Sequence, residues 1–203
     1  MINLYSGTPG SGKSFHSAKD IKFYLNRGVF VISNVDINLN CFSKTVQKKI
    51  KKYNLFKYVR NEDLTPQFLK DFSKNYFTPF KENECLLVID ECSTFFNSRN
   101  WDKKDRSDWI LFLQQHRKLG FNIVLICQCD RMIDRQIRGF IETEYKHRSL
   151  KNLKTFGFLL NFFFGGLFIV IEYYYPIHLK CGSKFLKFSP RVAKLYDTFT
   201  IYE

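Results

Sequence analysis

The chain has 203 residues, of which 45% are hydrophobic and 25% are charged, and its formal net charge is +13 at pH 7. These values are ordinary for one globular domain with a substantial core, and they exclude a disordered or fibrous chain. The 23 Phe and 11 Tyr indicate a bulky core. The charge favours a polyanionic partner, either nucleic acid or an anionic membrane surface, unless it only reflects a low-GC genome rich in lysine codons.

The six cysteines and four histidines show no metal-binding spacing. No two cysteines form a C-x-x-C pair, and the histidines are scattered along the chain. Cys85 and Cys127 border apolar runs, which predicts small buried hydrophobic residues. We expect reduced thiols, a cytoplasmic setting and no structural zinc. Because a strand begins at the N-terminus, we also expect no cleavable signal peptide.

The first motif is a glycine-rich octapeptide between a strand and a helix. Residues 2–5 predict a short buried strand, and residues 15–26 predict a helix that ends at Gly28. The octapeptide fits the phosphate-loop (Walker A) pattern G-x-x-x-x-G-K-[ST] at every specified position. It consists of Gly7, Thr8, Pro9, Gly10, Ser11, Gly12, Lys13 and Ser14.

This octapeptide predicts a site for nucleotide phosphates. Its glycines allow a tight turn whose N–H groups point at one oxyanion, at the N-terminus of the following helix. Lys13 is expected to reach the β- and γ-phosphates, and the Ser14 hydroxyl to ligate Mg²⁺. Phe15 completes the predicted nucleotide-binding segment.

A strand, a basic stretch and a helix come next. Residues 29–33 form a continuous apolar run, as in a parallel strand that is covered on both faces. Residues 44–57 hold the densest group of lysines, which either contacts phosphates or forms a solvated insertion. Pro66 fits the first turn of a helix that continues to Phe72.

Two carboxylates follow the second all-apolar strand. That strand, residues 85–89, runs directly into Asp90 and Glu91. Ligands of open α/β sheets collect at the carboxyl ends of strands. Asp90 is therefore expected to hold Mg²⁺ through its water shell, as a Walker B residue. Glu91 is expected to act as the general base on the attacking water.

A helix and a third strand lead to Gln128. Residues 105–119 have apolar residues at helical spacing, acidic residues at the start and Gly120 at the end. Residues 123–126 form the third buried strand. If this strand neighbours residues 85–89, Gln128 lies beside the γ-phosphate, where its amide could orient water or sense the phosphate. The alternative is a polar residue that only ends a strand.

Four arginines are candidates for an arginine finger, which stabilises transition-state charge in a neighbouring subunit. They are Arg99, Arg131, Arg135 and Arg138. For the last three, contact with phosphate or with a membrane surface is an equal interpretation. The sequence lacks the N-K-x-D element that is required for GTP specificity, so ATP is the expected nucleotide.

The stretch 156–171 has no charged residue and approaches the length of a membrane span. It contains Asn161 and the pair Gly165-Gly166, and Glu172 follows at once. We therefore predict two strands, residues 155–164 and 167–175, joined at the glycine pair as a hairpin. A membrane span is the alternative. Upstream, residues 141–146 alternate as in a strand with one solvated face.

The order of these elements predicts the fold class. Strands that alternate with helices favour an α/β P-loop NTPase, with a mainly parallel central sheet flanked by helices and a C-terminal antiparallel β extension. We expect a single domain, with a nucleotide-binding core at residues 1–140 and an aromatic, β-rich extension at residues 141–203.

The chain resembles the N-terminal ATPase domain of the zonula occludens toxin family, which includes the inner-membrane assembly proteins of filamentous bacteriophages. The phosphate loop and the strand before Asp90 carry the part of the resemblance that many ATPases share. Three further segments are more specific: residues 95–99 (FFNSR), residues 115–123 (QHRKLGFNI) leading to Gln128, and residues 194–198 (KLYDT).

The resemblance implies a motor-like ATPase related to hexameric DNA-pumping and helicase ATPases. In the family it works at the cytoplasmic face of the host inner membrane and drives assembly and extrusion of the virion. Lys13, Ser14, Asp90 and Glu91 would keep the roles given above. The membrane-spanning segment that is typical of the family is expected beyond residue 203 or is absent from this chain.

The sequence leaves three functions open. The first is a Mg²⁺- and ATP-dependent assembly motor, a homo-oligomeric ring such as a hexamer, with phage assembly proteins, the virion and the inner-membrane surface as partners. The second is a nucleic-acid-translocating ATPase whose basic residues track single-stranded DNA. The third is a scaffold that binds nucleotide only to order a ring.

Overall fold

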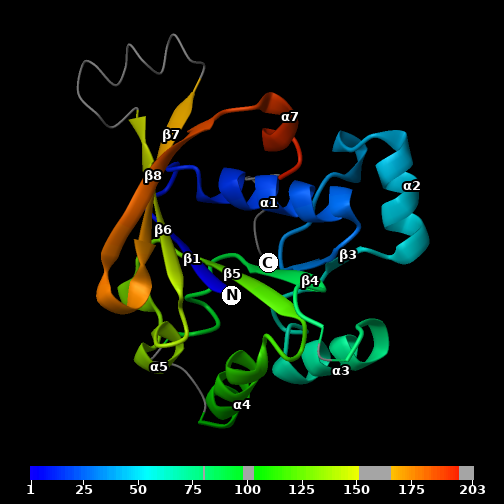
Figure 1. Ribbon diagram of the computed structural model, residues 1–203, viewed down its shortest axis with the longest axis horizontal. Coiled ribbons are helices and arrows are strands. Elements are labelled where there is room, and N and C mark those ends of the chain that lie inside the picture. Colours follow the sequence, from blue (N-terminus) through cyan, green and yellow to red (C-terminus); the bar gives the residue numbers. More distant parts are fainter. Residues whose placement is uncertain (80, 98–102, 151–165, 197–203) are drawn as a thin grey trace.

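The computed structural model describes residues 1–79, 81–97, 103–150 and 166–196, and their strands form one mixed sheet (Figure 1). The strands are β1 (Ile2–Ser6), β2 (Phe30–Ser33), β3 (Phe56–Tyr58), β4 (Cys85–Ile89), β5 (Phe121–Ile126), β6 (Thr143–Ser149), β7 (Leu167–Tyr174) and β8 (Leu179–Lys187). The α-helices are α1 (Lys13–Arg27), α2 (Lys44–Tyr53), α3 (Pro66–Tyr76), α4 (Lys103–Gln115), α5 (Arg135–Arg138) and α7 (Pro190–Ala193). Short 3₁₀ turns are η1 (Leu39–Cys41), η2 (Asp130–Met132) and η4 (Tyr175–Ile177).

The order of strands across the sheet is β3-β2-β4-β5-β1-β6-β7-β8. The strands from β3 to β6 in this order pair in parallel, whereas β7 is antiparallel to β6 and to β8. Because β5 lies between β1 and β4, the residues after β5 come between the phosphate loop and the Asp90 turn. The sheet order therefore brings three predicted site segments to one edge.

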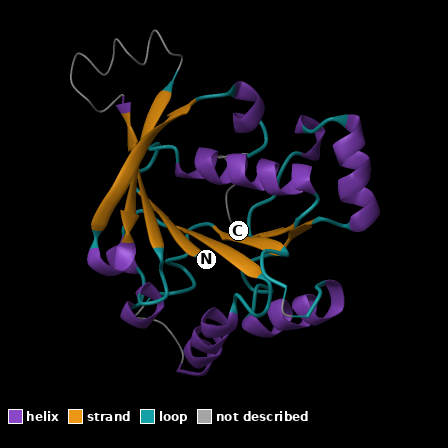
Figure 2. Ribbon diagram, viewed as in Figure 1, coloured by secondary structure: helices purple, strands orange, loops and turns teal. Residues whose placement is uncertain are grey.

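Helices cover both faces of the parallel part of the sheet (Figure 2). In Figure 1, α1, α2 and α7 lie on one face, and α3 and α4 lie on the other. Successive residues of β4 alternate between these layers: Leu86 and Val88 join the cluster that includes Ile21 of α1, and Leu87 and Ile89 join the cluster that includes Phe112. Burial on both faces explains why these strands read as continuous apolar runs.

The mixed sheet confirms the predicted fold class, and most predicted elements occur near their expected positions. Gly28 caps α1 in the left-handed conformation, Pro66 occupies the first turn of α3, and α4 ends at Gln115, before the predicted residue 119. Cys85 and Cys127 are fully buried, as predicted. The basic stretch forms helix α2 followed by the edge strand β3, with Ile50 buried.

Two predictions concern the C-terminal strands. The predicted strand 167–175 is β7, while its predicted partner, residues 155–164, lies outside the described residues. In the described part of the chain, no helix has the length and apolar character needed to cross a membrane.

The prediction that residues 141–146 form a strand with one solvated face was wrong at Glu144. Its side chain is buried, because β6 pairs in parallel with β1 and the Ser6 hydroxyl donates a hydrogen bond to the Glu144 carboxylate. A polar residue on an alternating strand can thus face a buried polar partner instead of water.

Candidate functional site

The phosphate loop joins β1 to α1 and points its backbone at a pocket. Gly12 caps the N-terminus of α1 with φ of 95°, a left-handed conformation that L side chains rarely adopt. A Cβ at Gly12 would also lie 2.7 Å from the Phe168 ring. The position therefore requires glycine, both for its backbone angle and for the close approach of β7.

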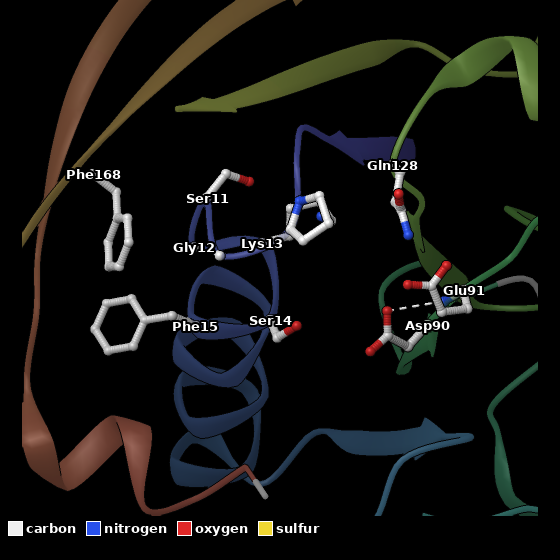
Figure 3. Close-up of a pocket in the computed structure, with 11 residues that line it drawn as sticks. Ser11, Gly12, Lys13, Ser14, Phe15, Asp90, Glu91, Gln128 and Phe168 are labelled. Carbon is white, nitrogen blue, oxygen red and sulfur yellow. Dashed lines mark hydrogen bonds between the residues drawn. The ribbon is translucent and has the colours of Figure 1, made fainter. Parts of the chain in front are cut away.

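The loop forms one wall of a pocket of about 380 Å³. Its lining residues are Pro9, Gly10, Ser11, Gly12, Lys13, Ser14, Phe15, Asp90, Glu91, Gln128 and Phe168. In Figure 3, Asp90, Glu91 and Gln128 lie on one side of the α1 N-terminus, and Phe15 and Phe168 lie on the other. The pocket thus has a polar, acidic end and an aromatic end, with the phosphate loop between them.

The side chain of Lys13 closes the phosphate loop. Its Nζ donates to the carbonyl oxygens of Gly7 at 2.8 Å and Thr8 at 3.2 Å. Burial lowers the pKa of Lys13, and the charges of Glu91 and Asp90 act in the opposite direction. An ammonium group at this place is ready to neutralise phosphate charge.

A buried hydroxyl in the loop fits a bound phosphate. Ser11 is 1% exposed, and its Oγ has no hydrogen-bond partner among the described residues. Buried polar atoms are normally hydrogen-bonded, so an unpartnered Oγ on a pocket wall points to an external partner. Together with the anion-binding N-terminus of α1, this donor fits the phosphates of a nucleotide.

Asp90 is the most firmly held carboxylate of the pocket. Its Oδ1 accepts a hydrogen bond from the Glu91 N–H at 2.9 Å, and its Oδ2 accepts one from the Tyr196 hydroxyl. Asn34, at the end of β2, accepts from the Asp90 N–H at 2.7 Å and donates to the Asp90 carbonyl at 2.9 Å. Both the backbone and the side chain of Asp90 are therefore fixed.

Glu91 combines an uncommon backbone conformation with a raised carboxyl pKa. It adopts φ of 46°, the left-handed region that is uncommon outside glycine and recurs at functional sites. Burial raises the pKa of its carboxyl, and the Asp90 charge adds to the rise. Lys13 and a side-chain hydrogen bond from Gln128 counteract it. A raised pKa makes the carboxylate a stronger proton acceptor.

The donor set near Asp90 fits Mg²⁺. The Ser14 hydroxyl points to the side of α1 where Asp90 lies (Figure 3), and hydroxyl and carboxylate oxygens are the hard ligands that Mg²⁺ prefers. The geometry thus brings together the predicted loop, both carboxylates and Gln128, and β4 and β5 are neighbours, as the placement of Gln128 requires.

The arginine-finger candidates are not brought into this pocket. Arg131 on η2 and Arg135 on α5 are exposed, and Arg138 on α5 hydrogen-bonds to Tyr175. None of these three is among the pocket's lining residues. Arg99 lies outside the described residues.

Comparison with known protein families shows which family the chain belongs to. The family model described as "Zonular occludens toxin (Zot)" matches residues 1–162, which is most of the chain. The chain belongs to the zonular occludens toxin family. A curated relative, the Gene 1 protein of Salmonella phage IKe, is 30% identical to this family member over 168 residues. The match covers 81% of the chain but only 45% of the phage protein, so the chain spans about half the length of the curated relatives it matches.

Solved structures show that this zonular occludens toxin domain has the fold of P-loop NTPases. The N-terminal domain of zonular occludens toxin from Neisseria meningitidis matches with a TM-score of 0.57 at 18% identity, over 97% of this chain and 98% of that one. The genome packaging NTPase B204 from Sulfolobus turreted icosahedral virus 2, in complex with ATP-gammaS, matches with a TM-score of 0.53 at 15% identity, over 92% and 96%.

Sequence reasoning missed three residues of the site in this zonular occludens toxin domain: Asn34, Phe168 and Tyr196. Asn34 followed an apolar run as Asp90 did, but a lone asparagine after a strand gave no specific signal. Phe168 was one of many aromatic residues in its stretch. Tyr196 lies in the segment KLYDT, which carried the family resemblance without an assigned role.

Proposed function

We propose that the chain is a Mg²⁺- and ATP-binding, ATP-hydrolysing motor domain for filamentous phage assembly and extrusion. The observation that supports this most strongly is the composition of one pocket. It combines the phosphate loop and Lys13 with a firmly held carboxylate, Asp90, and a carboxylate of raised pKa, Glu91.

Each residue has a role in this proposal. The loop N–H groups, Ser11 Oγ and Lys13 bind the phosphates, and Ser14 and Asp90 hold Mg²⁺, which would neutralise charge on the β- and γ-phosphates. Glu91 accepts the proton of the attacking water, and Gln128 orients Glu91 through their hydrogen bond. The purine base lies at the aromatic end, where Phe15 and Phe168 have ring centroids 5.8 Å apart.

The assembly role rests on the family. The curated relatives are Gene 1 proteins of filamentous phages such as IKe, which supports an assembly role. By the family resemblance, we propose that the motor works at the cytoplasmic face of the host inner membrane. We propose a homo-oligomeric ring, with phage assembly proteins and the virion as partners. Since Arg131, Arg135 and Arg138 are not in the pocket of their own chain, an arginine finger would come from the adjacent subunit.

A second candidate is DNA translocation. It is favoured by the net charge of +13 and by exposed lysines along α2, including Lys48, Lys51 and Lys52. A basic face of this kind can follow a phosphate backbone. The family relationship to phage assembly proteins favours the first candidate.

The test is steady-state ATP hydrolysis by the purified chain and two variants. Lys13→Ala should abolish nucleotide binding, because it removes the cation that faces the phosphates. Glu91→Gln should retain Mg²⁺-dependent ATP binding but lose hydrolysis, because an amide cannot accept the proton. Unchanged ATP affinity in Lys13→Ala would refute the phosphate-loop assignment, and normal turnover in Glu91→Gln would refute the general base.

The same assay separates the candidate functions. Specific activity that rises steeply with protein concentration indicates sites completed between subunits, as in a ring. Activity linear in concentration indicates a self-contained site. Stimulation by single-stranded DNA favours translocation, and an absence of hydrolysis in the presence of nucleotide binding favours a scaffold.

A further inference from the structure

The segment after α7 reaches the nucleotide site from the far end of the chain. Tyr196 is 106 residues from Asp90 in the sequence, yet its hydroxyl donates a hydrogen bond to Asp90 Oδ2 inside the protein. Tyr196 is 7% exposed and Asp90 is 8% exposed, so water is largely excluded from this bond. A hydrogen bond to a charged acceptor in such surroundings is stronger than an exposed one.

Packing fixes the place of Tyr196. The preceding residue, Leu195, is fully buried in the cluster that contains Ala18 and Ile21 of α1. Its carbonyl accepts a hydrogen bond from the Asn38 N–H at 2.9 Å. Helix α7 itself lies against α1 (Figure 1). The tyrosine therefore extends toward Asp90 from a segment that is anchored on the helix carrying the phosphate loop.

The hydrogen bond is compatible with a metal role for Asp90. Oδ1 accepts from Glu91 and Oδ2 accepts from Tyr196, but a carboxylate offers about four lone-pair positions. Each oxygen thus retains capacity for a metal-bound water. With one donor on each oxygen, the carboxylate is held in one orientation before the metal arrives.

We propose that Tyr196 is a positioning residue that orients Asp90 toward Mg²⁺ and couples the C-terminal segment Pro190–Tyr196 to the metal at the nucleotide site. The proposal rests on the proposed function, because it requires Mg²⁺ to bind at Asp90. The coupling is reciprocal: if the tyrosine favours the metal-binding orientation, bound Mg²⁺·nucleotide favours the docked segment.

The first test is calorimetric titration of ATPγS into the purified chain over a series of Mg²⁺ concentrations. Tyr196→Phe keeps the ring and removes the hydroxyl. This substitution should raise about tenfold the Mg²⁺ concentration at which ATPγS binding is half-maximally enhanced. A tenfold change is the lower end of the loss of metal affinity that follows when a hydrogen-bond partner of a metal ligand is removed. ATPγS affinity without metal should be unchanged, and a merely structural defect would lower both.

Tyr175→Phe is the matched control. Tyr175 is also buried, and its hydroxyl donates to a carboxylate, Asp130 Oδ2, at 3.0 Å. Neither Tyr175 nor Asp130 lines the nucleotide pocket. The control variant should show the wild-type Mg²⁺ dependence. A wild-type dependence in Tyr196→Phe, or an equal shift in both variants, would overturn the proposal.

The second test needs no substitution in the site. Hydrogen–deuterium exchange in the wild-type chain should slow for peptides covering residues 190–196 when Mg²⁺·ATPγS is added, and less so for ATPγS with a chelator. Exchange that is insensitive to Mg²⁺ would overturn the coupling. If the wild-type chain bound no ATPγS at any Mg²⁺ concentration, the proposed function would fail and this proposal with it. Normal wild-type binding without any Tyr196 effect removes this proposal alone.

Discussion

Asn34 should be one of the most sensitive polar residues of the molecule. It is 2% exposed, and its side chain satisfies both the N–H and the carbonyl of Asp90, at 2.7 and 2.9 Å. In Asn34→Ala both backbone groups lose their partner within the core. A buried polar group left unsatisfied costs about 1–3 kcal/mol, so the expected loss of unfolding free energy is about 2–6 kcal/mol. Since domains of this kind are stable by about 5–15 kcal/mol, the variant should be close to unfolding.

Urea unfolding followed by circular dichroism, with linear extrapolation, measures this loss. Asn34→Leu separates the causes: it keeps roughly the volume of the side chain but removes both hydrogen-bonding groups that face the Asp90 backbone. A hydrogen-bond effect destabilises Asn34→Leu as well, whereas a cavity effect largely spares it.

Asn61→Ala is the control for the Asn34 variants. Asn61 is exposed, and its Oδ1 accepts a hydrogen bond from the Asn34 amide at 3.0 Å. Its replacement should cost about 0.5–1.5 kcal/mol. An Asn34→Ala variant within about 0.5 kcal/mol of the wild type would show that water or backbone movement replaces both bonds, and the reasoning would be refuted.

Two further predictions follow from the aromatic end of the pocket and from a buried histidine pair. Phe168→Ala should raise the Kd for ATP about tenfold, because stacking on an aromatic ring contributes about 1–3 kcal/mol per base, and it should leave the Kd for tripolyphosphate unchanged in calorimetry. Equal losses for both ligands would mean that Phe168 supports the loop at Gly12 instead. The His16 Nδ1 and His147 Nε2 atoms are 2.9 Å apart. Burial lowers the pKa of His16 to about 2, and the neighbouring charges add to this effect. Burial also lowers the pKa of His147 to about 4. Both pKa values are depressed on folding, so the stability that the neutral pair confers is present above about pH 6.5 and is lost as the pH falls toward 4. His16→Gln should flatten the pH dependence of the unfolding free energy by up to about 1.4 kcal/mol per pH unit in this window, and an unchanged slope in urea unfolding would contradict it.

The parts of the site that the sequence predicted are local in the chain. The phosphate loop is a contiguous pattern in which Gly12, Lys13 and Ser14 specify both the turn and its chemistry. Asp90 was recognisable because it directly follows an apolar strand. Gln128 depended on one assumption about neighbouring strands, which the pairing of β4 with β5 fulfils.

The parts that the sequence did not predict depend on distant contacts. The three missed residues reach the site through strand order and helix packing: Asn34 lies 56 residues from its partner and Tyr196 lies 106 residues from the same partner. No local pattern encodes such pairs. Strand β8 was missed because it is an edge strand whose exposed lysines and small residues give no clear alternation.

Glu144 was misjudged for the same reason. Alternation shows which residues share a face of a strand, but it does not show what covers that face. The parallel pairing of β6 with β1 places the Ser6 hydroxyl against the Glu144 carboxylate. This pairing could not be inferred from residues 141–146 alone.

Substitutions in one half of the site should therefore affect nucleotide binding without affecting stability, whereas substitutions in the other half should affect both. The half formed by Lys13 and Ser14 belongs to one continuous loop, so its substitutions can remove binding from a chain that remains folded. Asp90 is instead held by β2 through Asn34 and by the C-terminal segment through Tyr196. Any change that weakens this support must alter both the orientation of Asp90 and the packing of these segments. If Mg²⁺ binds at Asp90 as proposed, its presence would favour the docked position of both segments, and this would give the proposed ATP hydrolysis a physical route to movement elsewhere in the protein.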